Sequence, residues 1–499
     1  MNNKKINSAI VIGGGFGGIS SALRLKKMGY DVTLVDNNPM LGGRAQVYTD
    51  GIFKYDAGPT VITAPILFDE LFELFGKKRS DYVEFLPVKP WYKFIFSDGE
   101  YLRYGGSIEE TTEEINRISP NDVDGYKNLL KFSKEIFDIG YTKLADQPFH
   151  KFKTMLKQIP HLIRLKSYLT VFQLVSLFIK DGRLRKALSF HPLLVGGNPL
   201  ETTSIYCLIH YVEREWGIWF AKGGTGALVS AMETLMIEEN IKVIKNTSVN
   251  RILFNDSIVC GIEVDNKSKQ IFSDIVVCNG DPTYTYSNLI DKSKRKKWSN
   301  KRLSRLKQSM GLFVWYFSTS RTYKNVEHHT IIMGNKYKEL LDDIYNKKIL
   351  SDDLSLYLHR PSATDPSMSP DGYDSFYVLA PVPNNISGID WEKKSDEIIE
   401  QISNTLEKTV LPNFKDSIVS SKFVTPDTFE NEFKTSYGSG FSIAPIFTQS
   451  AWFRFHNKSE IKNLFFTGAG THPGAGLPGV INSAKLLEKV VPKVKYNDE

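Results

Sequence analysis

The sequence predicts an α/β protein whose central sheet is assembled from separated segments. The first 36 residues have the pattern of a strand, a glycine turn, a helix and a second strand. Residues 241–285 return to strands, and residues 461–495 repeat a strand, a glycine-rich turn and a helix. These three stretches fit one doubly wound parallel sheet, with an α+β region inserted between its parts.

The composition is that of a folded globular protein with two or three domains. The chain has 499 residues, of which 41% are hydrophobic and 24% are charged. Cys207, Cys260 and Cys278 are too scattered for a disulfide framework or a C-x-x-C motif, so we expect core residues in a reducing cytosol. No run of about 18 apolar residues predicts a membrane span, and the first residues do not resemble a signal peptide.

The first strand, Ala9–Ile12, is followed by a glycine loop that opens a helix. The loop is Gly13-Gly14-Gly15-Phe16-Gly17-Gly18 and contains the pattern G-x-G-x-x-G. The first glycine of the pattern permits a tight turn, the second lets the backbone approach a pyrophosphate, and the third lets helix and strand pack closely. Because free N–H groups at a helix N-terminus favour an anion, the loop predicts a dinucleotide site. A glycine-rich loop of an unrelated α/β protein is the alternative.

The second strand, Val32–Val35, ends at Asp36, 23 residues after Gly13. A carboxylate at this position can accept hydrogen bonds from an adenosine ribose. Gly42-Gly43-Arg44 follows, and the spacing from Gly18 to Arg44 resembles the fingerprint of the flavoproteins that include amine oxidases, protoporphyrinogen oxidases and carotenoid desaturases. The resemblance implies that the cofactor is FAD, with Gly42, Gly43 and Arg44 against its pyrophosphate and flavin. Most of these relatives have Glu in place of Asp36, and either carboxylate can bind ribose hydroxyls.

Three later segments extend the resemblance. Asp56-Ala57-Gly58-Pro59-Thr60 matches a turn near the flavin ring. Val249 matches a valine whose backbone holds the adenine, and an ordinary strand residue explains it nearly as well. The stretch from Asn463 to Leu477, with a helix expected to begin near Gly479, resembles the signature of bacterial-type phytoene desaturases. The resemblance therefore places a further group of residues at the cofactor: Gly58, Pro59, Thr60, Val249, Gly468, Gly470, Gly479 and Val480.

Four other segments, which begin at Phe190, Glu213, Phe220 and Phe447, are similar to the desaturases that form lycopene. This likeness implies repeated desaturation of phytoene and partly desaturated carotenoids, with hydride transfer from an allylic carbon to FAD. The electron acceptor that reoxidises the flavin, oxygen or a quinone, is left open by the sequence. The sequence has no metal-ligand spacing and no motif that fixes an acid or a base. His472 and Glu213 are the two candidates, and His472 fits a turn residue better.

Other functions share parts of this pattern. A C30 desaturase, a carotenoid isomerase or a carotenoid oxygenase would have the same FAD motifs. A non-catalytic prenyl-lipid carrier of the same fold would not need the intact glycine loop, Asp36 and Gly42–Arg44. An amine oxidase would usually have an aromatic cage around the flavin, which the sequence does not reveal.

Residues 151–186 hold the basic character of the chain. This window contains nine Lys or Arg and one acid, a net charge of +8 in a chain whose total is +7. Beyond Pro160, apolar residues recur at helical spacing. They are Leu162, Leu165, Leu169, Phe172, Val175 and Ile179. A basic amphipathic helix is typical of a protein on anionic lipid, and a helix that packs its apolar stripe on the core is the alternative.

From this window we expect a cytoplasmic protein that associates peripherally with the inner membrane. We expect no nucleic-acid partner, because no binding motif accompanies the charge. The FAD-binding domain is expected to comprise residues 1–70, 216–290 and 446–499. Residues 71–215 would form a helical, membrane-facing substrate region, and residues 291–445 would form the substrate domain.

Overall fold

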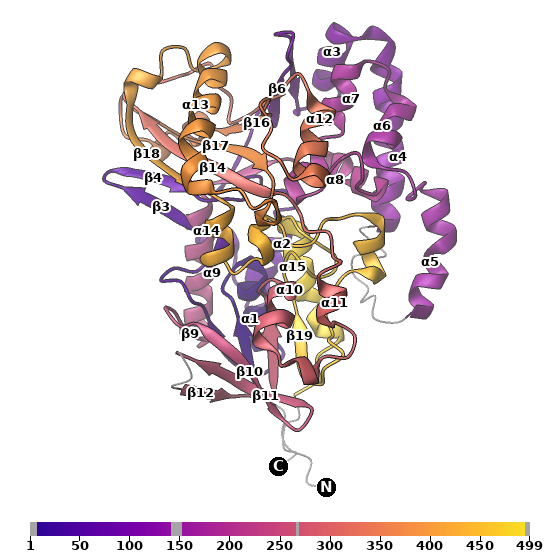
Figure 1. Cartoon of the computed structure of the whole chain (residues 1–499), viewed down its shortest axis with the longest axis vertical. Coiled ribbons are helices and arrows are strands. Elements are labelled where there is room, and N and C mark those ends of the chain that lie inside the picture. Colours follow the sequence, from indigo (N-terminus) through magenta and orange to yellow (C-terminus); the bar gives the residue numbers. More distant parts are fainter. Residues whose placement is uncertain (1–6, 141–151, 266–268, 495–499) are drawn as a thin grey trace.

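The structure is a computed structural model that describes residues 7–140, 152–265 and 269–494. Its lower part in Figure 1 is a five-stranded parallel sheet with the order β19-β13-β1-β2-β9. The strands are β1 (Ser8–Ile12), β2 (Asp31–Val35), β9 (Lys242–Ile244), β13 (Ile275–Cys278) and β19 (Leu464–Phe466). They come from three separated segments, which confirms the predicted assembly of this sheet.

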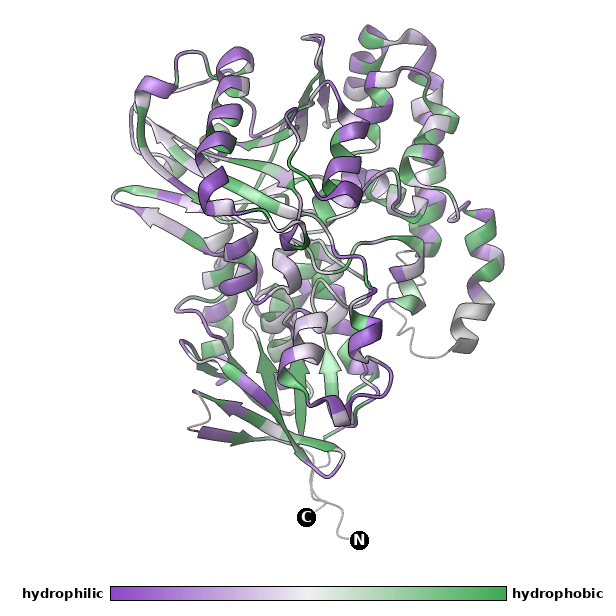
Figure 2. Ribbon diagram, in the orientation of Figure 1, coloured by the Kyte–Doolittle hydropathy of each residue, from purple (hydrophilic) through white to green (hydrophobic). Residues whose placement is uncertain are grey.

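The parallel sheet is buried, which explains why its strands are almost continuous apolar runs. All residues of β13 and β19 are buried, as are the last four residues of β1. Helix α1 (Phe16–Lys27) packs against α2 (Ile66–Glu73), α9 (Thr225–Glu238) and α15 (Leu477–Lys485). Figure 2 shows the hydrophobic colour concentrated on the strands of this sheet.

A seven-stranded mixed sheet forms the upper part of the molecule, with the order β18-β14-β17-β16-β15-β6-β7. β15 and β6 are parallel and the other pairs are antiparallel. The strands are β6 (Tyr92–Ile95), β7 (Tyr101–Tyr104), β14 (Gly311–Thr319), β15 (His329–Ile332), β16 (Leu356–His359), β17 (Asp374–Val382) and β18 (Ile418–Val424). Helices α12 (Tyr337–Asp342), α13 (Trp391–Thr409) and α14 (Pro426–Asn431) belong to the same part of the chain.

Smaller elements complete the two sheets. An antiparallel sheet of β10 (Val249–Asn255), β11 (Ile258–Val264) and β12 (Lys269–Phe272) lies beside β13. The pairs β3 (Val47–Asp50) with β4 (Phe53–Asp56) and β5 (Phe85–Pro87) with β8 (Trp219–Ala221) are two-stranded. Short helices α10 (Pro282–Tyr284) and α11 (Asn300–Leu303) follow β13. Cys207 and Cys278 are buried as expected, whereas Cys260 is half-buried.

A cluster of helices lies toward the right of Figure 1 and shares a hydrophobic core with the mixed sheet. They are α3 (Ile108–Ile118), α4 (Val123–Ile139), α5 (Phe152–Arg164), α6 (Val171–Phe178), α7 (Gly182–Leu188) and α8 (Leu208–Trp216). Within the described ranges, no helix is long and apolar enough to cross a bilayer. The bounds predicted for the five parts of the chain, and a membrane-facing role for this cluster, stay predictions.

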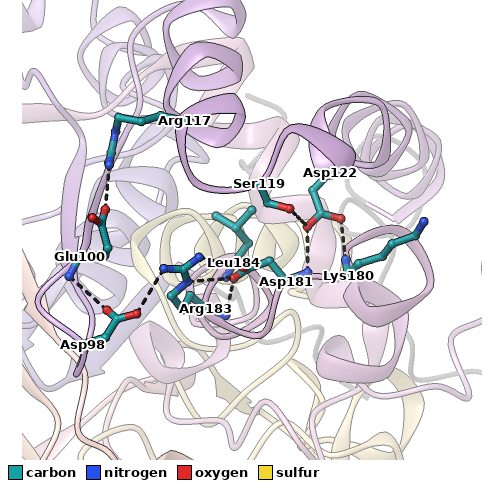
Figure 3. A network of polar contacts seen from close by, with 9 residues as sticks. All are labelled: Asp98, Glu100, Arg117, Ser119, Asp122, Lys180, Asp181, Arg183 and Leu184. Atoms are coloured by element: carbon teal, nitrogen blue, oxygen red, sulfur yellow. Dashed lines mark hydrogen bonds and ion pairs between the residues drawn. The ribbon is translucent and has the colours of Figure 1, made fainter.

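Polar contacts in this cluster connect the basic window to acids from other segments (Figure 3). Asp122 accepts hydrogen bonds from the backbone N–H groups of Lys180 (2.6 Å) and Asp181 (2.8 Å). Asp181 in turn caps α7, and Arg183 forms ion pairs with Asp181 (2.9 Å) and Asp98 (3.2 Å). Part of the window's charge is therefore neutralised within the fold.

The predicted single amphipathic helix in the basic window is wrong. Residues 152–188 form three helices, and Pro160 lies inside α5 rather than dividing it from the next helix. The predicted stripe faces inward, because Leu165, Val175 and Ile179 are fully buried. Its other members, Leu162, Leu169 and Phe172, are half-buried. The side chains of three basic residues of the window, Lys151, Lys153 and Lys157, lie outside the described residues.

Arg24 holds distant segments of the lower part together. Its guanidinium is 1% exposed and forms ion pairs with Glu70 on α2 (3.0 Å) and with Glu488 near the C-terminus (2.6 Å). We predict that Arg24→Met lowers the unfolding free energy by about 1.5–3 kcal/mol, because two charge-assisted hydrogen bonds are lost. Thermal and urea unfolding measure the effect. Lys134→Ala, which breaks the exposed pair with Asp138 on α4, is the control and should leave the melting temperature unchanged. Equal melting temperatures for Arg24→Met and wild type would contradict the prediction.

Candidate functional site

One cavity of about 920 Å³ extends from the glycine loop of the parallel sheet to the apolar face of the mixed sheet. Its wall includes all of the eighteen predicted cofactor residues except Gly14 and Gly18. The fold therefore brings together motifs that are separated by more than 400 positions in the sequence. Gly14 and Gly18 lie directly behind the wall, where they shape the loop.

The glycine loop has its conformation because side chains are absent at set positions. Gly13 has φ +92°, which an L side chain rarely adopts. A Cβ on Gly18 would lie 1.8 Å from the carbonyl oxygen of Gly13, so only glycine allows α1 to approach β1 this closely. A Cβ on Gly15 would meet no atom closer than 3.2 Å, and this glycine lines the cavity. Gly15 thus leaves backbone open to a ligand, whereas Gly18 serves packing.

Asp36 lies at the end of β2 and anchors the loop. Its Oδ2 accepts a hydrogen bond from the Gly14 N–H (2.6 Å) and its Oδ1 accepts one from the Asn38 N–H (2.7 Å). Burial raises the pKa of this carboxyl, and the two backbone donors oppose that shift. Val249, the first residue of β10, lines the cavity close by in the same wall.

The second glycine turn places Arg44 beside the cavity. Gly42 has φ +110° and its N–H donates to the carbonyl of Gly14 (2.8 Å), so the two glycine turns are in direct contact. The Arg44 guanidinium donates a hydrogen bond to the carbonyl of Gly440. Burial lowers the pKa of Arg44, and the Asp281 carboxylate opposes that shift.

The C-terminal glycine segment packs against the first glycine loop, since a Cβ on Gly17 would lie 3.2 Å from Gly468 Cα. The Gly468 N–H donates to Ser483 Oγ (2.8 Å), which connects the segment to α15. Helix α15 begins at Leu477, two positions before the predicted Gly479, and Gly479 and Val480 line the cavity in its first turn. His472 is buried in the wall, where its backbone N–H donates to Phe455 and its carbonyl accepts from Asn457.

The apolar end of the cavity was not predicted in any residue detail. Strands of the mixed sheet contribute alternate residues, such as Leu312 with Val314 and Leu379 with Pro381. The segment 190–212, which connects α7 to α8 and includes the first part of α8, contributes aliphatic and aromatic side chains. In the sequence, the signal for this wall was the alternation of side chains along β14 and β17. It could not reveal the cavity, because both faces of these strands are apolar and buried.

A buried hydrogen-bond network extends from wall residues Thr60, Tyr357 and Tyr377 to a group of histidines behind the wall. The hydroxyl of Thr60 is 2.7 Å from the hydroxyl of Tyr377, and the hydroxyl of Tyr357 is 2.7 Å from Nδ1 of His329. His328 and His359 touch through their Nε2 atoms at 3.1 Å. Burial lowers the pKa of His328 to about 3 and lowers the pKa of the other two imidazoles well below the usual value.

The three histidines are therefore neutral at physiological pH. Their nitrogens lie within 4.8 Å of one another, close enough to be considered as metal ligands. The sequence did not reveal this cluster, because His359 is 30 positions from His329. No carboxylate joins the set, and several of its nitrogens already have hydrogen-bond partners. The arrangement is that of a neutral polar network supporting Tyr357 and Thr60.

Comparison with known proteins agrees with this arrangement. The profile of the family described as "Flavin containing amine oxidoreductase" matches residues 16–486. A phytoene desaturase (lycopene-forming) from Pseudescherichia vulneris is 43% identical over 97% of this chain and 99% of its own. A second, from Pantoea ananas, is 41% identical over 95% and 97%. Cyclohexylamine oxidase from Brevibacterium oxydans IH-35A has the same fold, with a TM-score of 0.62 at 15% identity and coverage of 97% and 98%.

The fold and the glycine-lined cavity are those of an FAD-dependent oxidoreductase. The chain belongs to the flavin-containing amine oxidoreductase family and, within it, to the phytoene desaturases. The described residues fit FAD, because Gly13 and Gly42 have conformations suited to glycine and Gly15 leaves its backbone open to the cavity. The buried Asp36 carboxylate adds an acceptor at the same end.

Asp56, the last residue of β4, has an unusual carboxyl. It is buried, its Oδ1 accepts from the N–H groups of Thr225 (2.9 Å) and Gly226 (3.4 Å), and its Oδ2 has no hydrogen-bond partner among the described atoms. Burial raises its pKa to about 7. The protonated form is thus favoured in the folded state, and the stability that it contributes is lost as the pH rises through about 7.

We predict that the melting temperature of Asp56→Asn increases relative to that of wild type as the pH rises from about 4 to about 8. In wild type the buried Asp56 carboxyl must ionise over this range, whereas the amide of the variant does not ionise. Differential scanning calorimetry across this range measures the difference. Asp352→Asn, at an exposed carboxylate, is the control and should show a pH-independent offset. A constant difference for Asp56→Asn would contradict the raised pKa.

Proposed function

We propose that this protein desaturates phytoene to lycopene in repeated rounds. The observation that supports this function is the continuity of the cavity, in which the glycine turns at one end and a largely apolar wall at the other share one space. FAD, when bound, supplies the two-electron acceptor for a hydride. The chain's own residues would bind and orient both molecules and exclude water from them.

The predicted cofactor residues have separate roles in this proposal. The loop Gly13–Gly18 and α1 would hold the pyrophosphate with backbone N–H groups. Asp36 would accept the ribose hydroxyls, and the backbone of Val249 would contact the adenine. Arg44 and Gly58–Thr60 would lie along the flavin, and the first turn of α15 would place helix-dipole charge near it.

The apolar wall would bind the polyene by burial alone. A C40 hydrocarbon offers no polar group, so its affinity would come from roughly 25 cal/mol per Å² of apolar area removed from water. The wall residues from β14, β17 and the segment 190–212 provide such a surface. A prenyl-lipid carrier of this fold would have no use for the Asp36-anchored glycine loop that lines the other end. Both relatives named above are lycopene-forming, which favours phytoene over a C30 substrate.

We predict that the purified protein, incubated with FAD and phytoene in liposomes, forms lycopene, and that Gly15→Trp forms none. The indole would fill the space that Gly15 leaves open, so FAD binding should be lost while the fold is kept. Chromatography and absorption spectra identify the carotenoids, and flavin content is measured separately. Gly182→Ala, at an exposed position with no atom within 4 Å of the added Cβ, is the control. Unchanged phytoene with FAD bound would overturn the substrate assignment and leave the flavoenzyme.

We also propose that the protein takes its substrate from an anionic membrane surface at the α5 end of the cavity. Leu162 and Ser167 line the cavity there, together with Phe447 and Phe453, which are also partly exposed. Ile159, Ile163 and Tyr168 expose large apolar side chains on the same segment. Figure 1 shows α5 at the edge of the molecule. Such a surface supports a peripheral location on the inner membrane, facing the cytoplasm.

We predict that Ile163→Glu weakens binding to anionic vesicles by about tenfold or more, because a charge replaces apolar area that would enter the lipid interface. Vesicle flotation measures the bound fraction. Ile237→Glu is the matched control, because both isoleucines are 62% exposed and Ile237 belongs to α9, outside the cavity wall. Equal flotation of the two variants would contradict a membrane contact at α5.

A further inference from the structure

A buried acid–imidazole pair lies in the wall of the cavity. Oε2 of Glu213 is 2.9 Å from Nε2 of His191, and Tyr92 donates its hydroxyl hydrogen to Oε1 of Glu213 (3.0 Å). The Glu213 side chain is 1% exposed to solvent, yet Glu213 and Tyr92 both line the cavity. Burying a carboxylate is costly unless it is paired, so the fold has organised this site around it.

Helix α8 presents Glu213 toward the cavity. Leu208, Ile209 and Val212 line the cavity from the same helix, at spacings that form one face with Glu213. Tyr92 reaches the carboxylate from β6, and its ring lies 4.9 Å from that of Phe190. On its cavity side Glu213 is bordered by hydrocarbon and aromatic groups. Tyr92 and His191 are its hydrogen-bond partners, and Tyr104 and Arg214 interact with it electrostatically.

The described wall has two other carboxylates, and both lie toward the nucleotide end. Asp36 accepts backbone N–H bonds on both oxygens. Asp281 accepts on Oδ1 from the Tyr284 N–H and the Ser436 hydroxyl, close to the C-terminal glycine segment, and its Oδ2 has no hydrogen-bond partner among the described atoms. Glu213 is the carboxylate of the described wall that lies at the apolar end of the cavity. Each of its oxygens has one identified partner, and a carboxylate oxygen can accept two hydrogen bonds.

We propose that Glu213 is the base that removes the proton in each desaturation round, with His191 and Tyr92 as positioning residues. This proposal rests on the proposed function. Desaturation removes one hydride and one proton from neighbouring carbons. The allylic C–H bond breaks and both electrons leave with the hydride to FAD, so the substrate becomes an allylic cation. The adjacent C–H bond then breaks, its electron pair forms the new C=C bond, and the proton goes to a carboxylate oxygen of Glu213.

The surroundings of Glu213 suit both halves of this chemistry. An anion in a site of low dielectric constant stabilises a cation that develops beside it. The contact between Oε2 and Nε2 of His191 holds the second carboxylate oxygen in place. Tyr92 holds Oε1 in a fixed orientation, so the second oxygen remains near the cavity.

The test compares wild type with Glu213→Gln, which keeps the size of the side chain and removes its basicity. We expect Glu213→Gln to bind FAD and phytoene as wild type does and to form lycopene about 100-fold more slowly or less. In deuterated water under anaerobic conditions, phytoene recovered from wild type should gain deuterium by reversal of the proton step. Phytoene recovered from Glu213→Gln should gain none. If Glu213 had a purely structural role, its replacement would not change the incorporation of deuterium into recovered phytoene.

Two further variants keep the test decisive. Tyr92→Phe retains the carboxylate and should lose less than about tenfold in rate. Glu201→Gln changes a carboxylate outside the cavity, where Glu201 pairs with Lys307, and should behave as wild type. If Glu213→Gln does not fold, Glu213→Asp tests the proposal instead. Its shortened carboxylate should slow the formation of lycopene, while FAD and phytoene should bind as they do to wild type. An unchanged rate in that variant overturns the proposal.

Two other results also overturn the assignment of Glu213. One is a rate for Glu213→Gln within about threefold of wild type. The other is deuterium uptake that survives in Glu213→Gln and is lost in His472→Gln. Failure of wild type to form lycopene from phytoene is a separate outcome, which overturns the proposed function and the base together.

Discussion

The close approach of α1 to β1 at the glycine loop is the constraint on which the cavity depends. The Gly18 position tolerates no Cβ, because its neighbour is the backbone oxygen of Gly13, which cannot move without distorting the glycine loop. The loop is fixed from the other side by the hydrogen bond from Gly14 to Asp36. The same loop meets the second glycine turn, and that turn positions Arg44. A single packing requirement therefore aligns three predicted motifs along one wall.

The mixed sheet imposes the second condition on the cavity. Its strands β14 and β17 are buried almost throughout, so one face can form an apolar wall while the other packs into the core. The polar groups behind this wall are kept neutral by burial, as the lowered pKa values of His328, His329 and His359 indicate. A neutral network stiffens the wall through hydrogen bonds without placing charge beside a hydrocarbon.

The sequence predicted the nucleotide end well because glycine motifs are local and each has a steric reason. The parallel sheet, the Asp36 position and α15 were expected and are present, within two residues for the start of α15. The helical window was predicted poorly, since spacing alone cannot tell a stripe on one helix from residues shared by three. Tertiary contacts decided that Leu165 and Val175 face the core.

The apolar end could not be predicted for a different reason. Residues such as Leu312, Leu379 and Val212 have the composition of any core, and only the fold shows that they surround a space. The buried Glu213 was recognisable as a candidate but not as a member of a pair, because His191 is 22 positions away and reaches it through a turn between helices.

The environment of Glu213 is what distinguishes it from other acids. An acid in a polar pocket needs no special explanation, whereas a carboxyl–imidazole pair buried beside a hydrocarbon surface is costly to remove from water. Replacing such a pair by apolar residues of similar volume is often neutral or stabilising. The placement of Glu213 in the wall thus points to chemistry that apolar packing alone would not require.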